Sequence, residues 1–380
     1  MIHKMVELGT LIKQAKTVRC GEREYPVLSM TMHDGLVFQD DKFKKGIASK
    51  DRSEYKVVFR NQLVISFPID EGVLAAQRIT DAGIVSPAYG VWDIDQKQIL
   101  PEFLEYALRC DRSISYYKAK LRGSTARRRS LPTPTLLAHT IPLPDINEQK
   151  YILEIIHKVK DIVDNRRLEL LRLDALIKAR FVEMFGDITI NDKGWDIQPL
   201  GELCTIVRGG SPRPIEQFLG GTIPWIKIGD ATEGESIYLN CTKEHIIQEG
   251  VKKSRLVKAG SLIFANCGVS LGFARIITFD GCIHDGWLAM EDIDERINKI
   301  FLLQALNQMT EHFRSIAPAG TQPNLNTAIM KAYRQIIPPM KLQHEFISFV
   351  EQVDKSKAEV QKSLDEAQLL FDSLMQQYFG

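Results

Sequence analysis

The sequence predicts an α+β fold with an internal pseudo-twofold repeat, in which two similar globular α/β-mixed domains are separated by a pair of long antiparallel helices. A shift that places Phe185-Gly186 on Phe379-Gly380 also matches the residues before them without a gap. Both matched stretches carry apolar residues at alternating spacings of four and three, which is typical of a coiled-coil seam. The segments before them hold short β-like runs and short helices without regular alternation, which favours α+β over a doubly wound sheet.

The first predicted domain covers residues 1–147, and the second covers residues 187–341. Their short motifs correspond in order: MVELGTLI resembles IQPLGELCTIV, YPVLSM resembles IPWIKI, and FLEYAL resembles FLLQAL. The first domain contains 22 Lys and Arg residues against 17 Asp and Glu residues, a net charge of +5, whereas the whole chain carries only +1. A modestly basic segment permits contact with nucleic acid without establishing it.

Two long helices are predicted at residues 148–186 and 342–380. At ~1.5 Å per residue, residues 149–185 form a helix about 55 Å long, which exceeds the diameter of a typical domain of about 150 residues. The helices then serve as a spacer, unless both are core elements of one compact domain. The seam residues expected to pack are Ile152, Ile156, Val159, Val163, Leu170, Leu173, Ile177, Phe346, Val350, Val353, Val360, Leu364, Phe371 and Leu374.

Three cationic residues, Arg166, Arg180 and Lys357, also fall on the predicted seam. Each of them either pairs with an acid or extends its charged head to water. Gly186 is the expected end of the first helix, because a left-handed conformation costs glycine little. We expect residues 186–195 to link the two repeats.

Two short motifs resemble catalytic or metal sites. GVSLG, which contains Ser270, matches a nucleophile elbow, but strand-like runs flank it on both sides, so a β-hairpin is the better interpretation. CIHDG brings Cys282, His284 and Asp285 together without a fourth ligand nearby, which favours a turn or a structural histidine over a metal site. Walker A, GxGxxG and (D/N)PP(Y/F) runs are absent from the sequence, so we predict no catalytic residue, no metal and no cofactor in this chain.

The six cysteines form no CxxC pair, which indicates free thiols in a reducing compartment. No continuous apolar run follows the first positive charges, and no uncharged apolar stretch reaches the ~18 residues that a membrane span needs. We expect a cytoplasmic protein.

Polar and basic loops are the remaining candidates for function. Lys and Arg neutralise phosphates, whereas Arg, Asn and Gln can read base edges through paired hydrogen bonds. The three adjacent arginines after Gly123-Ser124-Thr125 do not suit a core, although any single cation here can also be plain solvated surface. The candidate DNA-binding residues are Lys44, Lys45, Lys118, Lys120, Arg122, Ser124, Thr125, Arg127, Arg128, Arg129, Arg208, Ser211, Arg213, Lys227, Lys252, Lys253, Arg255, Gln322, Asn324 and Asn326.

The whole arrangement resembles the specificity subunit of a type I restriction–modification system. The likeness rests on the two heptad helices, the proline-rich stretches 141–144 and 337–339 before them, and WDIQPLGELCTIVRGGSPRP…GGTIPWIKIGD, which follows the family's usual domain start. The first domain departs from that start, since it lacks the GG-x-P and IPW-type segments.

The resemblance implies a non-catalytic subunit whose two target recognition domains each read one half of a bipartite double-stranded DNA site. It implies that the spacer helices, residues 149–185 and 343–379, dock two methyltransferase subunits and, through them, restriction subunits. S-adenosylmethionine then belongs to the methyltransferase, which carries out DNA methylation, and ATP and Mg belong to the restriction subunit. Two alternatives stay open: a structural coiled-coil scaffold protein and a stand-alone DNA-modifying enzyme.

Overall fold

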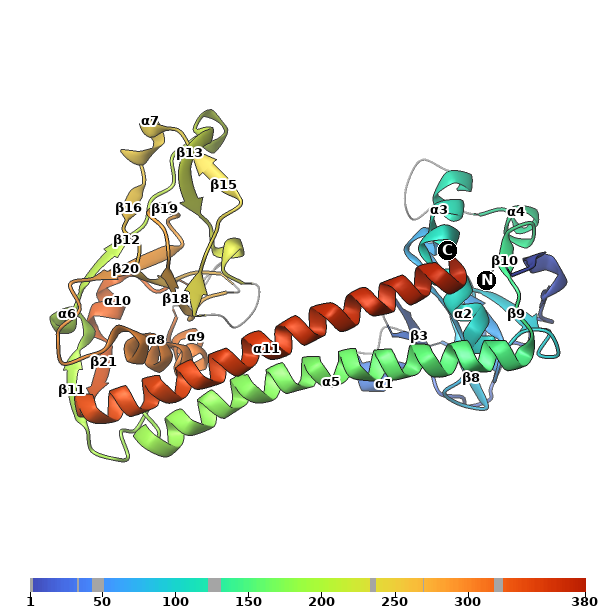
Figure 1. Ribbon diagram of the computed structural model, residues 1–380, viewed down its shortest axis with the longest axis horizontal. Helices are drawn as coiled ribbons and strands as arrows, with labels where there is room; N and C mark the ends of the chain where they lie inside the picture. Colours follow the sequence, from blue (N-terminus) through green and yellow to red (C-terminus); the bar gives the residue numbers. More distant parts are fainter. Residues whose placement is uncertain are drawn as a thin grey trace. The chain divides into compact units, whose positions relative to one another are not determined.

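A computed structural model describes residues 3–32, 34–42, 51–121, 131–232, 237–268, 270–317 and 324–380 (Figure 1). The chain forms two compact units. The first consists of Met1–Arg167 with Lys362–Gly380, and the second is Leu168–Gln361. Each long helix is therefore divided between the two units, whereas the sequence prediction treats helices and domains as separate segments.

The described part of the first unit contains short strands, short helices and parts of both long helices. The strands are β1 (Met5–Glu7), β2 (Ile12–Gln14), β3 (Leu28–Thr31), β4 (Gly35–Phe38), β5 (Lys56–Phe59), β6 (Leu63–Ile65), β7 (Leu74–Ala76), β8 (Ala82–Val85), β9 (Gly90–Ile94) and β10 (Thr140–Pro142). The helices are η1 (Leu8–Thr10), α1 (Gln39–Lys42), η2 (Ile69–Glu71), α2 (Pro101–Arg109), α3 (Asp111–Lys120), α4 (Thr133–Leu137) and the start of α5 (Ile146–Phe185).

The second unit repeats this order of elements. Its strands are β11 (Asp196–Pro199), β12 (Thr205–Arg208), β13 (Leu219–Ile226), β14 (Tyr238–Leu239), β15 (Glu244–Ile246), β16 (Arg255–Val257), β17 (Leu262–Ala265), β18 (Ala274–Ile277), β19 (Gly281–Ile283), β20 (Trp287–Glu291) and β21 (Arg334–Ile337). Its helices are α6 (Leu200–Leu203), η4 (Ile215–Gln217), η5 (Ile228–Asp230), α7 (Gln248–Val251), α8 (Lys299–Gln308), α9 (Thr310–Ile316), α10 (Thr327–Ala332) and the start of α11 (Met340–Phe379).

The two units share one topology. The sheet order β2-β9-β6-β7 in the first unit corresponds to β12-β20-β17-β18 in the second, where β14 adds an edge. A second layer joins two antiparallel pairs through a parallel contact, which pairs Val27 with Ile84 in the first unit and Trp225 with Cys282 in the second. The predicted α+β fold with an internal repeat is confirmed.

A buried aromatic pair recurs in both units. In the first unit, Phe103 of α2 lies 4.9 Å from Phe379 between ring centroids, and in the second, Phe301 of α8 lies 4.9 Å from Phe185. Phe185 ends the first sequence repeat, yet it packs in the second unit, and Phe379 packs in the first. The end of each long helix is therefore part of the core of the unit that the other repeat supplies.

A fully buried glutamine fixes the beginning of each long helix. The Oε1 atom of Gln149 accepts a hydrogen bond from the backbone N–H of Leu100 (2.8 Å), and its Nε2 group donates to the carbonyls of Gln98 and Pro144. Gln343 makes the same three bonds in the second unit, to Asn298, Arg296 and Pro338. Buried amides with every bond satisfied hold one geometry, because each lost bond costs free energy.

All fourteen predicted seam residues are buried or half-buried. In the second unit, Lys357 of α11 forms a 2.5 Å ion pair with Asp174 of α5. Arg180 instead pairs with Glu183 of its own helix and covers the ring of Phe349. In the first unit, Arg167 of α5 donates to Gln368 of α11 at 3.2 Å. Within each unit the two helices run antiparallel.

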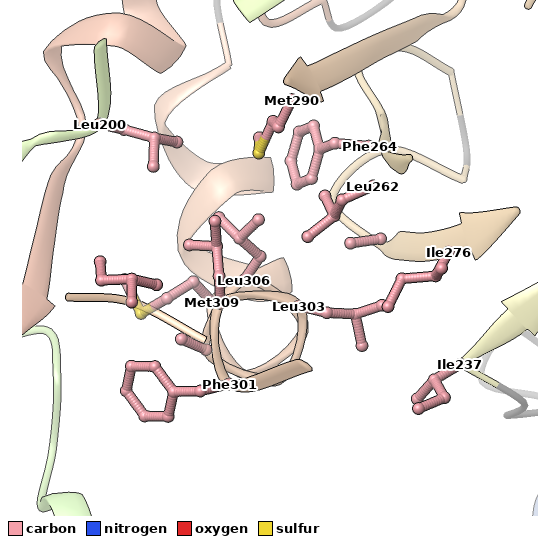
Figure 2. Packing of buried hydrophobic residues seen from close by; sticks show 14 of the residues in the cluster. Leu200, Ile237, Leu262, Phe264, Ile276, Met290, Phe301, Leu303, Leu306 and Met309 are labelled. Carbon is pink, nitrogen blue, oxygen red and sulfur yellow. The ribbon is translucent and has the colours of Figure 1, made fainter. Parts of the chain in front are cut away.

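The core of the second unit lies between α8 and the sheet. Leu262 and Phe264 of β17 and Met290 of β20 face Leu303 and Leu306 of the helix (Figure 2). All five side chains are buried. The sheet and α8 therefore enclose one apolar core in this unit.

Three smaller predictions are also decided. Gly186 ends α5 with a φ of +77°, so the predicted left-handed helix stop is confirmed. β17 and β18 pair as an antiparallel hairpin on either side of GVSLG, which removes the strand–turn–helix arrangement that a nucleophile elbow needs. Among the residues the structure describes, no helix is long and apolar enough to cross a membrane.

Candidate nucleic-acid interface

The RGG turn after β12 lies directly against the loop between β19 and β20. The backbone N–H groups of Gly209 and Gly210 donate to the carbonyls of Trp287 (2.9 Å) and Ile283 (3.0 Å). A Cβ atom on Gly209 would stand 2.2 Å from the carbonyl oxygen of His284, a contact that no side chain tolerates. The glycines of this motif therefore permit two backbones to approach closely.

Asp285 is the centre of the polar contacts in this turn. Its Oδ1 atom accepts a hydrogen bond from the Ser211 hydroxyl at 2.8 Å, and its Oδ2 atom lies 3.5 Å from Nη2 of Arg213. The Asp285 carbonyl accepts from Nε of Arg208 at 3.0 Å. Burial acts to raise the pKa of Asp285, but the Ser211 hydroxyl, His284 and the two arginines together hold it below its usual value. The carboxylate is therefore charged near neutral pH.

His284 lies beside this carboxylate in a defined tautomer. Its Nδ1 atom accepts the backbone N–H of Gly286 at 2.9 Å, so the neutral ring carries its proton on Nε2, which lies 3.0 Å from Oδ1 of Asp285. The ring also contacts Trp225, 5.6 Å away between centroids. Burial is the main cause that lowers the pKa of His284, and the nearby cations lower it further.

A second basic segment lies on the other side of the RGG turn. The Ser254 hydroxyl donates to the carbonyl of Gly210 at 2.7 Å. Next to it, the Lys253 ammonium lies 4.7 Å from the ring centroid of Phe218. Lys252 and Arg255 are exposed on either side.

Lys227 follows β13 next to His284, whose backbone N–H donates to Ile226. The Lys227 ammonium pairs with Glu244 of β15 and lies 5.7 Å from the ring centroid of Trp225. The ion pair and the ring hold this cation in place beside the histidine.

Seven predicted residues thus gather around one turn, although they come from three separate segments of the sequence. We call this group the second-unit basic surface; it consists of Arg208, Ser211, Arg213, Lys227, Lys252, Lys253 and Arg255. Arginines, lysines and a hydroxyl beside aromatic rings are the groups that contact phosphates and base edges.

The two predicted asparagines that the structure describes have local partners. Oδ1 of Asn324 lies 3.4 Å from Nδ2 of the buried Asn266, and the backbone N–H of Asn266 donates to Gly286. Asn326 caps α10, since its Oδ1 atom accepts from the backbone N–H of Ile329 at 2.9 Å. Asn324 is thereby connected through Asn266 to the loop that contains His284, whereas the side-chain oxygen of Asn326 is used to cap α10.

In the first unit, only Lys118 and Lys120 of the predicted set are described. Both lie exposed in the last turn of α3. The other candidates fall outside the described residues: Lys44, Lys45, Arg122, Ser124, Thr125, Arg127, Arg128, Arg129 and, in the second unit, Gln322.

The sequence is similar to known proteins of restriction–modification systems. Residues 192–367 match the family model for the type I restriction modification DNA specificity domain. This part of the chain is similar to the DNA specificity domain of type I restriction–modification systems. The chain is 23% identical over 304 residues to the type I restriction enzyme MjaIX specificity subunit of Methanocaldococcus jannaschii, which covers 74% of this chain and 69% of that protein.

Two solved structures share the fold of this chain. A chain from work on complex assembly and conformational transition of a type I restriction–modification system aligns with a TM-score of 0.60 at 17% identity, over 99% of this chain and 97% of that one. The type I S subunit from M. genitalium aligns with a TM-score of 0.51 at 16% identity, over 99% and 96% of the two chains.

Sequence reasoning does not place Asp285 at the centre of the candidate interface. His284 and Asp285 lie in the turn that the sequence predicts, and there Asp285 also contacts Arg208, Ser211 and Arg213. Among the described residues, no group of three or more His, Cys, Asp or Glu side chains is placed to hold a metal ion. No local sequence signal indicates the central position of Asp285, because Asp285 and Ser211 lie 74 positions apart.

Proposed function

We propose that this chain is a type I specificity subunit, that it recognises a bipartite duplex DNA target without catalysing a reaction, and that each unit reads one half. One observation carries the proposal: the two units share a scaffold but carry different side chains at the same loop. Counted from the equivalent pairs Val27–Ile84 and Trp225–Cys282, Ser86 and Pro87 take the places of His284 and Asp285. One fold that presents two different surfaces is what two different half-sites require.

The chemistry of the second-unit basic surface suits a DNA duplex. Its lysines supply charge to phosphates, which gives affinity and salt dependence. The guanidinium groups of Arg208 and Arg213 leave donors beyond their contacts with Asp285, and such donors pair with guanine edges in the major groove. Contacts to backbone and bases together position and specify a half-site.

The two long helices support the proposal of a molecular ruler. The Lys357–Asp174 ion pair and the seam fix the register of α5 against α11 in the second unit. A fixed helical register is the kind of element that sets half-site spacing, as dimer geometry does in other DNA-binding proteins. Inserting one helical turn within residues 160–175, with a matching turn in α11, should lengthen the unread spacer between the half-sites. An unchanged spacer would refute the ruler role.

The outer faces of the helices support docking of two methyltransferase subunits. In the second unit, Leu176 is 47% exposed and lines an open groove of about 630 Å³ together with Phe349 and Arg180. The repeat places Leu370, which is 49% exposed, and Ile155 at the corresponding positions of the first unit. Two equivalent apolar sites suit two identical partners. The proposal gives S-adenosylmethionine to those partners, and ATP and Mg to a restriction subunit.

The test is methylome sequencing of a host that carries this chain with its methyltransferase partner. We expect a two-part motif with an unread spacer that disappears when this chain is deleted. Methylation that the purified chain catalyses alone would identify a stand-alone enzyme instead. A motif that persists after deletion, together with binding that ignores sequence, would identify a scaffold protein.

A further inference from the structure

We propose that Asp285 is a positioning residue of the second-unit basic surface, and that neutral His284 holds the Asp285 loop in its binding geometry. The inference rests on the proposed function, because it names which groups set the shape of one reading surface. It predicts that recognition by the second unit depends on the protonation state of His284, a residue that Ser86 replaces in the first unit.

Geometry at Asp285 places one residue in contact with both ends of the RGGSPR segment. Its carbonyl holds Nε of Arg208 (3.0 Å), and its carboxylate holds the Ser211 hydroxyl (2.8 Å) and faces Arg213 at 3.5 Å. Arg213 is 79% exposed and keeps most of its donors available. The carboxylate therefore aims the arginine without using up its hydrogen-bonding capacity.

Neutral His284 completes the loop because its Nδ1 atom accepts the Gly286 N–H at 2.9 Å. A proton on Nδ1 would face that N–H, so protonation breaks this bond and releases the turn. The charged groups around the ring are Asp285 on its own loop, Arg208 and Arg213 from the β12 side, and Lys227 from the β13 side. Glu244 of β15 lies behind Lys227 and pairs with it, and the Cys267 thiol approaches from the β17 side, near Gly286.

Burial and the three cations lower the pKa of His284, while Asp285 opposes them. The ring is therefore neutral at neutral pH and becomes charged only as the pH falls below the ordinary histidine value of about 6.5. The folded loop loses its histidine bond over that range, so binding through this surface should weaken in acid.

The scaffold itself does not require the His–Asp pair. The first unit builds the equivalent loop with Ser86 and Pro87, and its strands β8 and β9 stand where β19 and β20 stand. Neither side chain of the first unit can titrate in this range. Because the fold forms without His284 and Asp285, and because both lie among cations, a role in binding explains this pair better than a role in folding. Nor is it a nucleophile site, because the Ser211 hydroxyl donates to Asp285 and not to the imidazole.

The experiment uses the full chain with its methyltransferase partner and duplexes that carry the motif found by methylome sequencing. Binding is measured for the correct duplex and for duplexes altered in either half, from about pH 5.5 to about pH 8. Asp285→Ala should reduce discrimination at one half-site by about tenfold, the size expected for a lost base-reading contact, and leave the other half unchanged. Asp285→Asn should recover part of it, because its carbonyl can still accept from Ser211.

The dependence of discrimination on pH shows whether His284 and Asp285 position the binding loop or only support the fold. Wild-type discrimination at that half should fall below about pH 6, and His284→Gln should give a flat profile, because glutamine has no proton to gain in this range. Asp81→Asn is the matched control, since Asp81 pairs with Arg60 in the first unit and is 97% exposed. Unchanged discrimination in Asp285→Ala, or an equal loss at both halves, overturns the inference while the proposed function stands. A wild-type complex that discriminates at neither half overturns both.

Discussion

At the scale of single residues, backbone proximity explains why the RGG motif contains glycine. Gly209 lies where the turn after β12 meets the loop before β20, and a Cβ there would stand 2.7 Å from the carbonyl oxygen of Ile283 and closer still to that of His284. Both atoms belong to the backbone, so neither can move without displacing the Asp285 loop. The same proximity brings Arg208 and Ser211 to Asp285.

Gly209→Ala should therefore destabilise the second unit by about 1–3 kcal/mol, the usual cost of overpacking, and weaken sequence-specific DNA binding. Gly229→Ala is the matched control, because a Cβ at Gly229 meets nothing within 4 Å. Calorimetric unfolding of both variants measures the difference. Equal unfolding midpoints for the two variants would contradict the close contact.

The candidate site was predictable only in part. Residue type alone makes Arg208, Ser211 and Arg213 candidates, because a run of glycine, serine and arginine between strands suits a binding loop. It could not identify Asp285, since Ser211 lies 74 positions away in the sequence. A motif of His and Asp is ambiguous until the fold supplies its neighbours.

At the scale of elements, two buried glutamines join the long helices to the loops before α2 and α8. Gln149 and Gln343 each satisfy one backbone N–H and two carbonyls, from the loop before a short helix and from the proline-rich stretch before the long one. The repeat shows in the sequence that Gln149 and Gln343 are equivalent, but it does not show which groups they bond. The start of α5 was predicted slightly late because the heptad begins inside the helix; the side chain of Asp145 accepts from the backbone N–H groups of Asn147 and Glu148 ahead of it.

Gln149→Glu or Gln343→Glu should lower the stability of its own unit by about 1–3 kcal/mol, because a carboxylate oxygen would then face two carbonyl oxygens. Gln352→Glu on the exposed face of α11 is the control. Thermal unfolding with a probe in each unit measures the effect. Loss of stability in the control as well would show that charge on the helix, and not the buried bonds, is responsible.

The apolar outer faces of the helices give a second test at this scale. Leu176→Asp and Leu370→Asp together should reduce co-purification of the methyltransferase partner at least tenfold, because each puts a charge into a site that docking would bury. Each single variant should reduce the number of bound partners from two to one, measured by native mass spectrometry. Glu169→Asp is the control on the same helix. Full assembly of the double variant would place the docking site elsewhere.

At the scale of the whole molecule, the repeat organises the chain as two copies of one unit whose helix ends are exchanged. Phe185 and Phe379 complete the cores of the units that the other repeat builds. The repeat, the heptads and the fold class followed from the sequence because periodicity survives substitution. The division of each helix between two units did not, since it depends on which core receives each helix end.

The central claim is that each unit reads its own half of the target, and a domain exchange tests it most directly. Residues 1–140 are replaced by the corresponding segment of another specificity subunit, and the methylome of a host carrying the hybrid with its methyltransferase is sequenced. The account predicts a motif in which one half is new while the other half and the spacer length are unchanged. A motif altered in both halves, or in neither, would contradict it.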